Sequence, residues 1–200
     1  MLRNERKVEL KERIYLQSLQ LFKEKGFDQV TIEEITQVCG IAKGTFFNYF
    51  ARKEAVLFHI GSKQIESVHE SMRQYVHMTD QKEKLILIFH HLFDQYAAYP
   101  DMIGLTISEM MRSMLLMREE LNLVKKFQDV LMSILEEAKK SGQLSEHMDC
   151  ADVASVLIGI YFHSIMIWVS TGEGIQRLET IFRPKFEVVW EGIHPRRDAS

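Results

Sequence analysis

One eleven-residue stretch, GIAKGTFFNYF over residues 40–50, combines side chains that could contact a nucleic acid. Lys43 offers a cation for a phosphate or a guanine edge, and Asn48 offers an amide that can bond bidentately to adenine. Gly44 permits a close backbone approach, and Phe47 could lie against a thymine methyl group. This mixture favours recognition of a polyanion over catalysis.

The other reactive side chains do not form a catalytic or metal-binding pattern. The glycines, lysine and threonine of residues 40–45 stand in the wrong order for a phosphate-binding loop. His90 and His91 are adjacent, so on a helix they point about 100° apart and cannot hold one metal from a single face. The run HMDC over residues 147–150 has no second cluster to pair with and is typical of a loop before a helix cap. We therefore expect no enzyme, no metal and no cofactor.

The composition is that of a globular protein in a reducing compartment. The chain has 200 residues with a hydrophobic fraction of 46%, so it is long and apolar enough to bury a core. Cys39 and Cys150 lie far apart in sequence, which indicates neither a disulfide framework nor a zinc module. The N-terminus lacks the apolar core of a signal peptide. We expect a cytoplasmic protein.

The charge is distributed unevenly along the chain. Residues 1–53 hold ten basic and seven acidic side chains, a net charge of +3, whereas the whole chain carries −3. The remaining residues therefore carry −6. This layout is the one expected when only one end of a molecule meets a polyanion.

Helical periodicity runs along the whole chain, so the sequence predicts an all-α fold. Inward positions recur every three to four residues from Leu10 to Phe22, and the pattern ends at Gly26. Further helices are expected over residues 54–77, after Asp80, over residues 119–140, after Asp149, and from about residue 175 through Trp190. No charged residue occurs in residues 153–169, but this segment is shorter than the roughly 20 apolar residues of a membrane span. It is interpreted as a buried helix.

Two short helices near the N-terminus have the spacing of a helix-turn-helix. Thr31 and Glu34 form a potential capping box for the first of them, which is expected to bury Val38 and to end at a glycine. Only about three residues separate it from a helical pattern that begins near Lys43, and so short a glycine-containing turn makes two helices cross steeply. Three aromatic residues are expected to face inward from the second helix: Phe46, Tyr49 and Phe50.

From Ile14 to Leu57 the chain contains LF-x-x-x-GF, then T-x-x-x-I, then G-x-x-x-GT-F-F-x-Y-F-x-x-K-x-x-x-L, without a gap. This pattern resembles the DNA-binding region of the TetR family of bacterial transcriptional regulators. The resemblance implies phosphate contacts by Thr31 and Lys53. It places six residues on or beside a DNA recognition surface: Lys43, Gly44, Thr45, Phe47, Asn48 and Tyr49.

Structural roles remain open at some of these positions. Thr31 is also a helix cap, and Tyr49 is as well placed for the core as for a DNA contact. At the position of Phe47 the family often has tyrosine, whose hydroxyl can bond a phosphate that phenylalanine cannot bind.

The resemblance implies two domains, a helix-turn-helix DNA-binding domain of residues 1–53 and a helical effector-binding and dimerisation domain of residues 54–200. The last two helices are too apolar for a lone surface layer, which independently indicates a homodimer interface. A two-fold dimer implies a near-palindromic operator. The residues expected at the interface are Ile160, His163, Ile167, Phe186 and Trp190.

Methionines, aromatic residues and isolated polar groups are spread over the middle helices. Such a lining suits an adaptable apolar pocket, and the resemblance implies an effector site there. Plain core packing explains each of these residues too. The residues predicted for the pocket are His90, Tyr96, Met110, Met114, Tyr161 and Trp168.

The function that the resemblance implies is ligand-responsive, sequence-specific DNA binding. The usual role in the family is repression, with a small and mainly apolar effector releasing the dimer from its double-stranded operator. The alternative is a helical protein-interaction module that does not bind DNA. Salt-dependent binding to duplex DNA separates the two.

Overall fold

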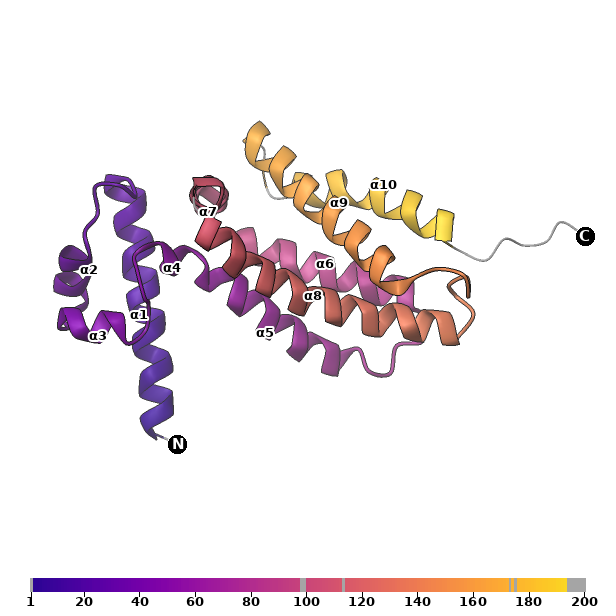
Figure 1. Ribbon diagram of the computed structural model, residues 1–200, viewed down its shortest axis with the longest axis horizontal. Helices are drawn as coiled ribbons and strands as arrows, with labels where there is room; N and C mark the ends of the chain where they lie inside the picture. Colours follow the sequence, from indigo (N-terminus) through magenta and orange to yellow (C-terminus); the bar gives the residue numbers. More distant parts are fainter. Residues whose placement is uncertain (1, 98–99, 113, 173, 175, 194–200) are drawn as a thin grey trace, which may run out of the picture. The chain divides into compact units, whose positions relative to one another are not determined.

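In the computed structural model, residues 2–97, 100–112, 114–172, 174 and 176–193 are described, and all regular structure in them is helical (Figure 1). This confirms the expected all-α fold. The helices are α1 (Leu2–Lys25), α2 (Ile32–Cys39), α3 (Lys43–Phe47), α4 (Glu54–Leu57), α5 (His59–Gln74), α6 (Gln81–Ala97), α7 (Pro100–Arg112), α8 (Met114–Lys140), α9 (Cys150–Thr171) and α10 (Gln176–Ile193).

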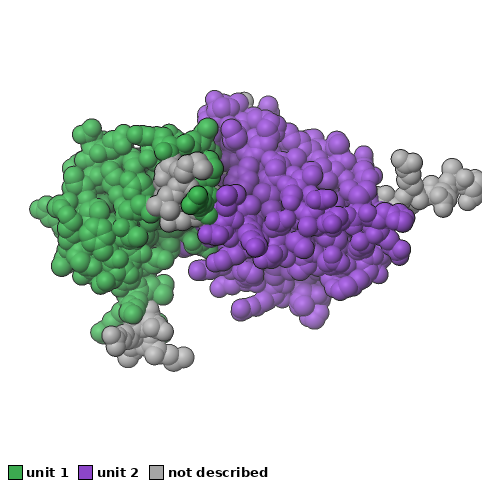
Figure 2. Space-filling model, viewed as in Figure 1, with its two compact units in different colours: residues 1–62, 101–118 green, residues 63–100, 119–200 purple. Residues whose placement is uncertain are grey.

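The chain divides into two compact units, which Figure 2 shows in different colours. Unit 1 consists of residues 1–62 and 101–118, and unit 2 consists of residues 63–100 and 119–200. Helix α7 therefore groups with the N-terminal helices, although it follows α5 and α6 in the chain. Helix α8 begins in unit 1 and continues into unit 2.

The core of unit 1 is built where α1, α2 and α3 meet. Ile14, Ile35 and Phe46 are each fully buried. Helix α1 ends at Gly26, whose positive φ of 83° allows the chain to turn while its N–H donates to the Phe22 carbonyl oxygen at 3.0 Å. These contacts give α2 and α3 a fixed base.

Helix α2 differs from the expectation at Val38, whose side chain is 51% exposed. Ile35, Thr36 and Cys39 occupy the inward positions of this eight-residue helix. Val38 lies about 100° from Cys39 around the helix axis and therefore faces outward. The carboxylate of Glu34 binds Lys25 of α1, whereas a capping box would have used it at the start of α2.

The helix expected over residues 54–77 is interrupted at Phe58, between α4 and α5. Val56, Leu57 and Phe58 are consecutive and all buried. Successive residues of a regular helix point about 100° apart, so three in a row cannot face one neighbour. The interruption lets all three pack inward.

Unit 2 is held together by an aromatic cluster between α6, α8, α9 and α10. Phe89 of α6 is fully buried and contacts the rings of Phe127, Tyr161 and Phe182 at centroid distances of 5.6, 5.8 and 4.6 Å. Aromatic pairs at such distances add about 0.5–1.5 kcal/mol each to the burial of their surface. Long-range side-chain packing therefore fixes these helices.

The predicted start of α9 is confirmed, because Asp149 accepts hydrogen bonds from the N–H groups of Ala151 at 2.7 Å and Asp152 at 3.3 Å. Helix α9 is long and apolar enough to cross a membrane by length and composition, a profile shared by core helices of soluble proteins. It packs along α10. The preceding helix, α8, starts at Met114, five residues before the expected Glu119.

Candidate nucleic-acid interface and ligand-binding core

The turn between α2 and α3 spans three residues and is fixed by backbone hydrogen bonds. Gly40 adopts a left-handed conformation with φ of 64°, and the Ile41 N–H donates to the Thr36 carbonyl oxygen at 3.0 Å. Phe46 then anchors α3 with no exposed surface. The predicted helix-turn-helix is therefore present.

The outward face of α3 carries the side chains whose types and spacing predict a nucleic-acid contact. Lys43, Gly44 and Asn48 are exposed, and the Phe47 ring is 45% exposed although it contacts the Phe46 ring edge-on at 5.7 Å. Thr45 and Tyr49 are half-buried beside this face. A cation, an amide and an apolar ring thus share one surface that is available to a partner.

Lys43 and Thr31 have partners within the protein. The Lys43 ammonium binds the Glu33 carboxylate, and this hydrogen bond holds the pKa of Glu33 below its ordinary value. Both side chains are exposed, so the pair is weak and a phosphate can replace it. The Thr31 hydroxyl accepts from the Glu34 N–H at 3.2 Å, and a hydroxyl that accepts one bond can still donate its hydrogen.

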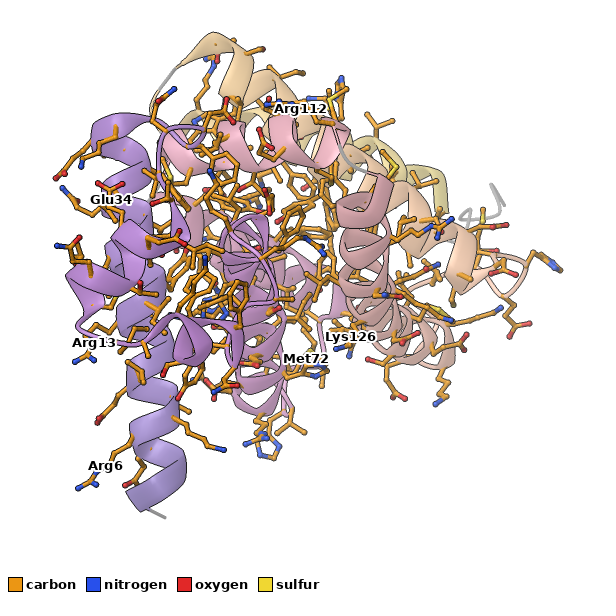
Figure 3. All side chains as sticks on the ribbon, turned by 60° about the vertical axis from the view of Figure 1, so that its left-hand side comes forward. Arg6, Arg13, Glu34, Met72, Arg112 and Lys126 are labelled. Atoms are coloured by element: carbon orange, nitrogen blue, oxygen red, sulfur yellow. The ribbon has the colours of Figure 1, made fainter. Side chains whose placement is uncertain are left out.

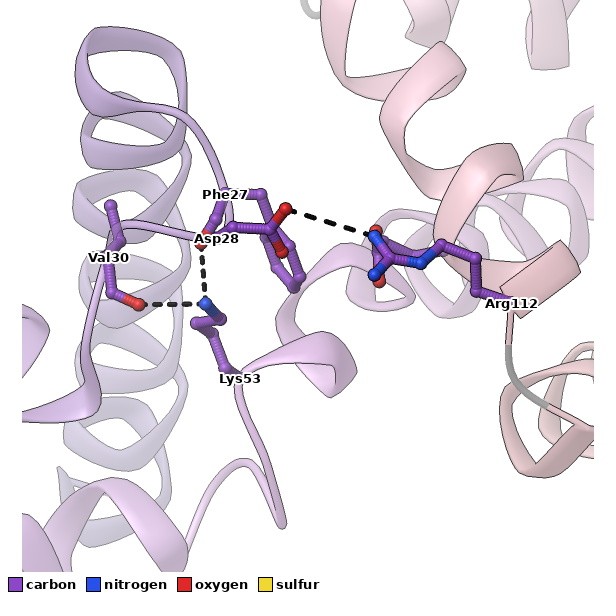
Figure 4. Close-up of polar contacts among 6 residues, drawn as sticks. Phe27, Asp28, Val30, Lys53 and Arg112 are labelled. Carbon is purple, nitrogen blue, oxygen red and sulfur yellow. Dashed lines mark hydrogen bonds and ion pairs between the residues drawn. The ribbon is translucent and has the colours of Figure 1, made fainter.

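Lys53 closes the loop between α1 and α2 (Figure 4). Its ammonium donates to the carbonyl oxygens of Phe27 at 2.6 Å and Val30 at 2.9 Å, and it lies 4.3 Å from the centroid of the Phe27 ring. An ammonium has three N–H donors, and these two bonds use two of them. The phosphate contact expected for Lys53 remains a prediction, whereas its contact with the loop is an observed structural role.

The same loop contacts α7. The Arg112 guanidinium lies 3.0 Å from the Glu109 carboxylate and 4.0 Å from the Asp28 carboxylate (Figure 4). Arg112 and Asp28 are largely exposed, so their ion pair contributes little to stability by itself. It nevertheless joins α7 to the loop that Lys53 holds.

In unit 2 two predicted pocket residues meet. The hydroxyl groups of Tyr96 on α6 and Tyr161 on α9 lie 2.8 Å apart in the buried interior. The ring of Phe93 stacks on Tyr161 with a centroid distance of 5.6 Å and an interplanar angle of 18°. Trp168, seven residues along the same face of α9, is also buried. The result is a polar pair surrounded by apolar surface.

Two family patterns cover most of the chain. The pattern described as bacterial regulatory proteins, tetR family, matches residues 14–60. The pattern described as YsiA-like protein, C-terminal region, matches residues 61–189. The chain belongs to the TetR family of bacterial regulatory proteins. It is a DNA-binding transcriptional regulator, which decides against the alternative of an interaction module without DNA binding.

Relatives of this TetR-family regulator include a regulator of fatty acid metabolism. The chain is 25% identical over 179 residues to the fatty acid metabolism regulator protein of Bacillus subtilis (strain 168), covering 88% of this chain and 92% of the relative. The fold is similar to that of FadR from Thermus thermophilus in complex with lauroyl-CoA, with a TM-score of 0.75 and 24% identity, covering 95% and 98% of the two chains. FadR from Bacillus subtilis in complex with stearoyl-CoA gives a TM-score of 0.73 and 22% identity, covering 92% and 99%.

The other predicted pocket residues of the TetR-family chain lie apart from the tyrosine pair. His90 is exposed, with its Nδ1 3.1 Å from Asp94 and its Nε2 3.6 Å from Glu179. Met110 is half-buried on α7, in unit 1. The Met114 side chain lies outside the described residues. The structure thus brings together Tyr96, Tyr161 and the surrounding rings, and leaves His90 on the surface.

The residues expected at the dimer interface fall into two groups. Phe186 and Trp190 are buried within unit 2, where their rings stack at a centroid distance of 6.1 Å. Because both side chains are buried in the core of the single chain, they are not exposed to a partner subunit. Ile160 and Ile167 are half-buried and His163 is exposed. The exposed large apolar residues of α9 and α10 are Val156, Met166 and Val188.

Polar side chains that the sequence did not indicate meet between α5 and α6. Ser67 Oγ and His91 Nε2 lie 2.5 Å apart, and the buried Gln64 donates to the Leu92 carbonyl oxygen at 3.4 Å. Polar residues at inward positions of an apolar helix pattern are the signal that could have revealed them. A separate open hollow of about 650 Å³ is lined by Thr79, Asp80, Lys82, Gln143, Trp190 and Glu191.

Proposed function

We propose that this chain is a cytoplasmic, homodimeric repressor that binds a near-palindromic operator and leaves it when a long-chain acyl-CoA binds. The observation that carries the proposal is the outward face of α3, where exposed Lys43, Phe47 and Asn48 stand on the buried anchor Phe46. Operator binding is assigned to residues 1–53. Effector binding and dimerisation are assigned to residues 54–200.

The operator contacts divide by chemistry. Lys43 and Asn48 have the groups that read guanine and adenine edges, and the exposed Phe47 ring suits a thymine methyl group. Thr31 and Lys53 contact phosphates, while Gly44, Thr45 and Tyr49 support the approach of the backbone. A bidentate contact such as that of Asn48 with adenine is worth about 1–3 kcal/mol of discrimination between sequences.

The effector class is supported by the named relative and by the interior of unit 2. A regulator of fatty acid metabolism is 25% identical over most of the chain. In unit 2, apolar rings surround the hydroxyl pair of Tyr96 and Tyr161. An acyl chain gains about 0.8 kcal/mol for each buried CH₂ group, and a thioester carbonyl can accept a hydrogen bond from a tyrosine hydroxyl.

The dimer is supported by the apolar residues that α9 and α10 leave exposed. Val156 and Met166 are 50% and 55% exposed, and Val188 is 71% exposed. An isologous two-fold contact would cover these side chains with their own copies. Such a dimer sets two copies of α3 at a fixed spacing, which accounts for a near-palindromic site.

Release from the operator follows from linkage between the two binding sites. The dimer has one state whose two α3 helices match the operator and another in which they do not. An effector that binds the second state more tightly lowers the affinity for DNA, at most by the ratio of its affinities for the two states. A coupling of about 2–3 kcal/mol would weaken operator binding roughly 30- to 150-fold.

The test begins with selection of bound duplexes from a random pool, followed by fluorescence anisotropy on the selected site. Wild-type protein should enrich a near-palindrome, and Lys43→Ala and Asn48→Ala should each weaken binding to it while the exposed control Lys125→Ala does not. Stearoyl-CoA should then release the DNA, and free coenzyme A should not. Failure to enrich any duplex would refute operator binding, and equal DNA affinity with and without stearoyl-CoA would refute the effector assignment.

A further inference from the structure

Helix α1 extends well beyond the part of the chain that matches the family pattern. The match begins at residue 14, whereas α1 begins at Leu2. The twelve additional residues form more than three helical turns, about 18 Å of helix. This extension carries five basic side chains and three acidic ones.

One side of the extension is used within unit 1. The Lys11 ammonium lies 5.6 Å from the centroid of the Phe50 ring, and Glu12 lies 3.7 Å from His59 Nε2. Both contacts hold α1 against the segment that leads from α3 to α5. Lys11 and Glu12 therefore have structural roles.

Arg6 and Arg13 project from another side of the extension. They are seven residues apart, so on a helix they lie within about 20° of each other. Figure 3 shows both side chains pointing the same way from α1. Both are exposed.

Helix α1 packs against α2, the first helix of the helix-turn-helix. Burial raises the pKa of the Cys39 thiol, and the positive charge of Arg13 offsets part of that rise. Cys39 is the last residue of α2, directly before the turn into α3. The charge of Arg13 thus acts on the end of α2, and Arg6 lies about 10.5 Å farther along the same exposed side of α1.

We propose that Arg6 and Arg13 bind phosphates of the DNA backbone and so extend the contact made by the helix-turn-helix along the duplex. Guanidinium groups bind phosphate oxygens bidentately and stay charged at any working pH. Their spacing of about 10.5 Å along α1 equals roughly three base-pair rises measured along the duplex axis. This inference rests on the proposed operator binding and adds a second site to it.

Glu9 lies between the two arginines along α1. It lies three residues after Arg6 and four before Arg13, on the same exposed face. A carboxylate there weakens attraction to a phosphate and competes for both guanidinium groups. The face therefore carries a net charge of +1, and removing the Glu9 charge should strengthen DNA binding.

The experiment is the salt dependence of DNA affinity, measured by anisotropy on the selected operator and on a random duplex. Arg6→Ala and Arg13→Ala should each reduce the slope of log K against log salt concentration by about 0.9, and together by about 1.8. The affinity at 50 mM salt divided by the affinity at 200 mM salt should therefore be about 3.5-fold smaller for each contact that is lost. The loss should be equal on both duplexes, because phosphates carry no sequence information.

Two variants act as controls. Arg73→Ala removes an exposed arginine of α5 in unit 2 and should leave the slope unchanged. Glu9→Gln should raise affinity for both duplexes. Thermal melting of each variant checks that α1 remains folded.

The outcomes separate this inference from the proposed function. Salt-dependent binding by wild type with an unchanged slope in the Arg6→Ala, Arg13→Ala double variant would overturn the phosphate site and leave operator binding intact. Loss of binding on the operator but not on the random duplex would also overturn it, since that pattern indicates base reading. Absence of duplex binding by the wild type would refute both.

Discussion

The Lys53 ammonium lies 2.6 Å from the Phe27 carbonyl oxygen and 4.3 Å from the centroid of the ring of the same residue. One cation thus holds both the backbone and the side chain of Phe27, the second residue of the α1–α2 loop. That loop leads directly into Thr31, the cap of α2. Lys53 is therefore placed to position α2 and, through it, the turn into α3.

We expect Lys53→Met to lower the free energy of unfolding by about 1–2 kcal/mol, because two carbonyl oxygens lose a charged donor. The stability loss is measured by urea denaturation. If Lys53 also binds a phosphate, the same variant will reduce the slope of log K against log salt concentration for operator binding by about 0.9. A variant that weakens operator binding without changing this slope would assign Lys53 to positioning alone.

Lys125→Met is the matched control for Lys53→Met, since Lys125 is exposed on α8. Its unfolding free energy and operator affinity should both equal those of the wild type. Unchanged stability in Lys53→Met would contradict the loop-closing role.

We expect Tyr96→Phe and Tyr161→Phe each to destabilise the protein by about 1 kcal/mol, because each removes one partner of a buried hydroxyl pair. The double variant should cost less than the sum, since both hydroxyls leave together. A double-mutant cycle on urea denaturation measures this coupling. Additive effects would show that the two hydroxyls do not stabilise each other.

Features that depend on one helix and its neighbours in sequence could be predicted well. The helix-turn-helix, the Asp149 cap of α9 and the exposure of Phe47 all follow from local spacing. In each case the contacts that fix the feature join residues only a few positions apart in the sequence.

Features that depend on which face of a helix meets another helix could not be predicted. The apolar pattern of α10 favours Phe186 and Trp190 equally for the monomer core and for a dimer interface, and packing against α6 and α9 places them in the core. The apolar pattern of α2 predicts a buried Val38, yet Cys39 takes the inward position. His90 lies at the surface beside the carboxylates of Asp94 and Glu179, and Glu179 is distant in sequence.

We expect the Cys150 thiol to resist alkylation in the folded protein. Burial, together with the neighbouring Glu136, raises the pKa of Cys150 from 9.0 to about 11. At pH 8 the thiolate fraction then falls to about one in a thousand, roughly 100-fold below that of the unfolded chain. The raised pKa contributes stability that is complete below pH 9 and is lost as the pH rises toward 11.

Iodoacetamide labelling at pH 8, read at each cysteine by mass spectrometry, checks this prediction. Urea-unfolded protein supplies the reference rate. Equal rates of Cys150 labelling in folded and unfolded protein would contradict it.

Dimerisation gives a prediction in which two residues of α10 behave oppositely. Val188 is 71% exposed and Phe186 is fully buried. Val188→Glu should leave the monomer folded and dissociate the dimer, because a carboxylate on the two-fold face would lie near its own copy. Phe186→Ala should instead cost about 3–5 kcal/mol of unfolding free energy through the cavity it leaves.

Analytical ultracentrifugation and urea denaturation of both variants separate these outcomes. Operator affinity of Val188→Glu should fall steeply, since a near-palindrome read by one copy of α3 loses half of its contacts. Val76→Glu, at an exposed valine two residues beyond the end of α5, is the matched control and should change neither mass nor affinity. If the Val188→Glu variant remains a dimer, the interface does not include this part of α10. The exposed Val156 and Met166 of α9 would then be the next positions to test.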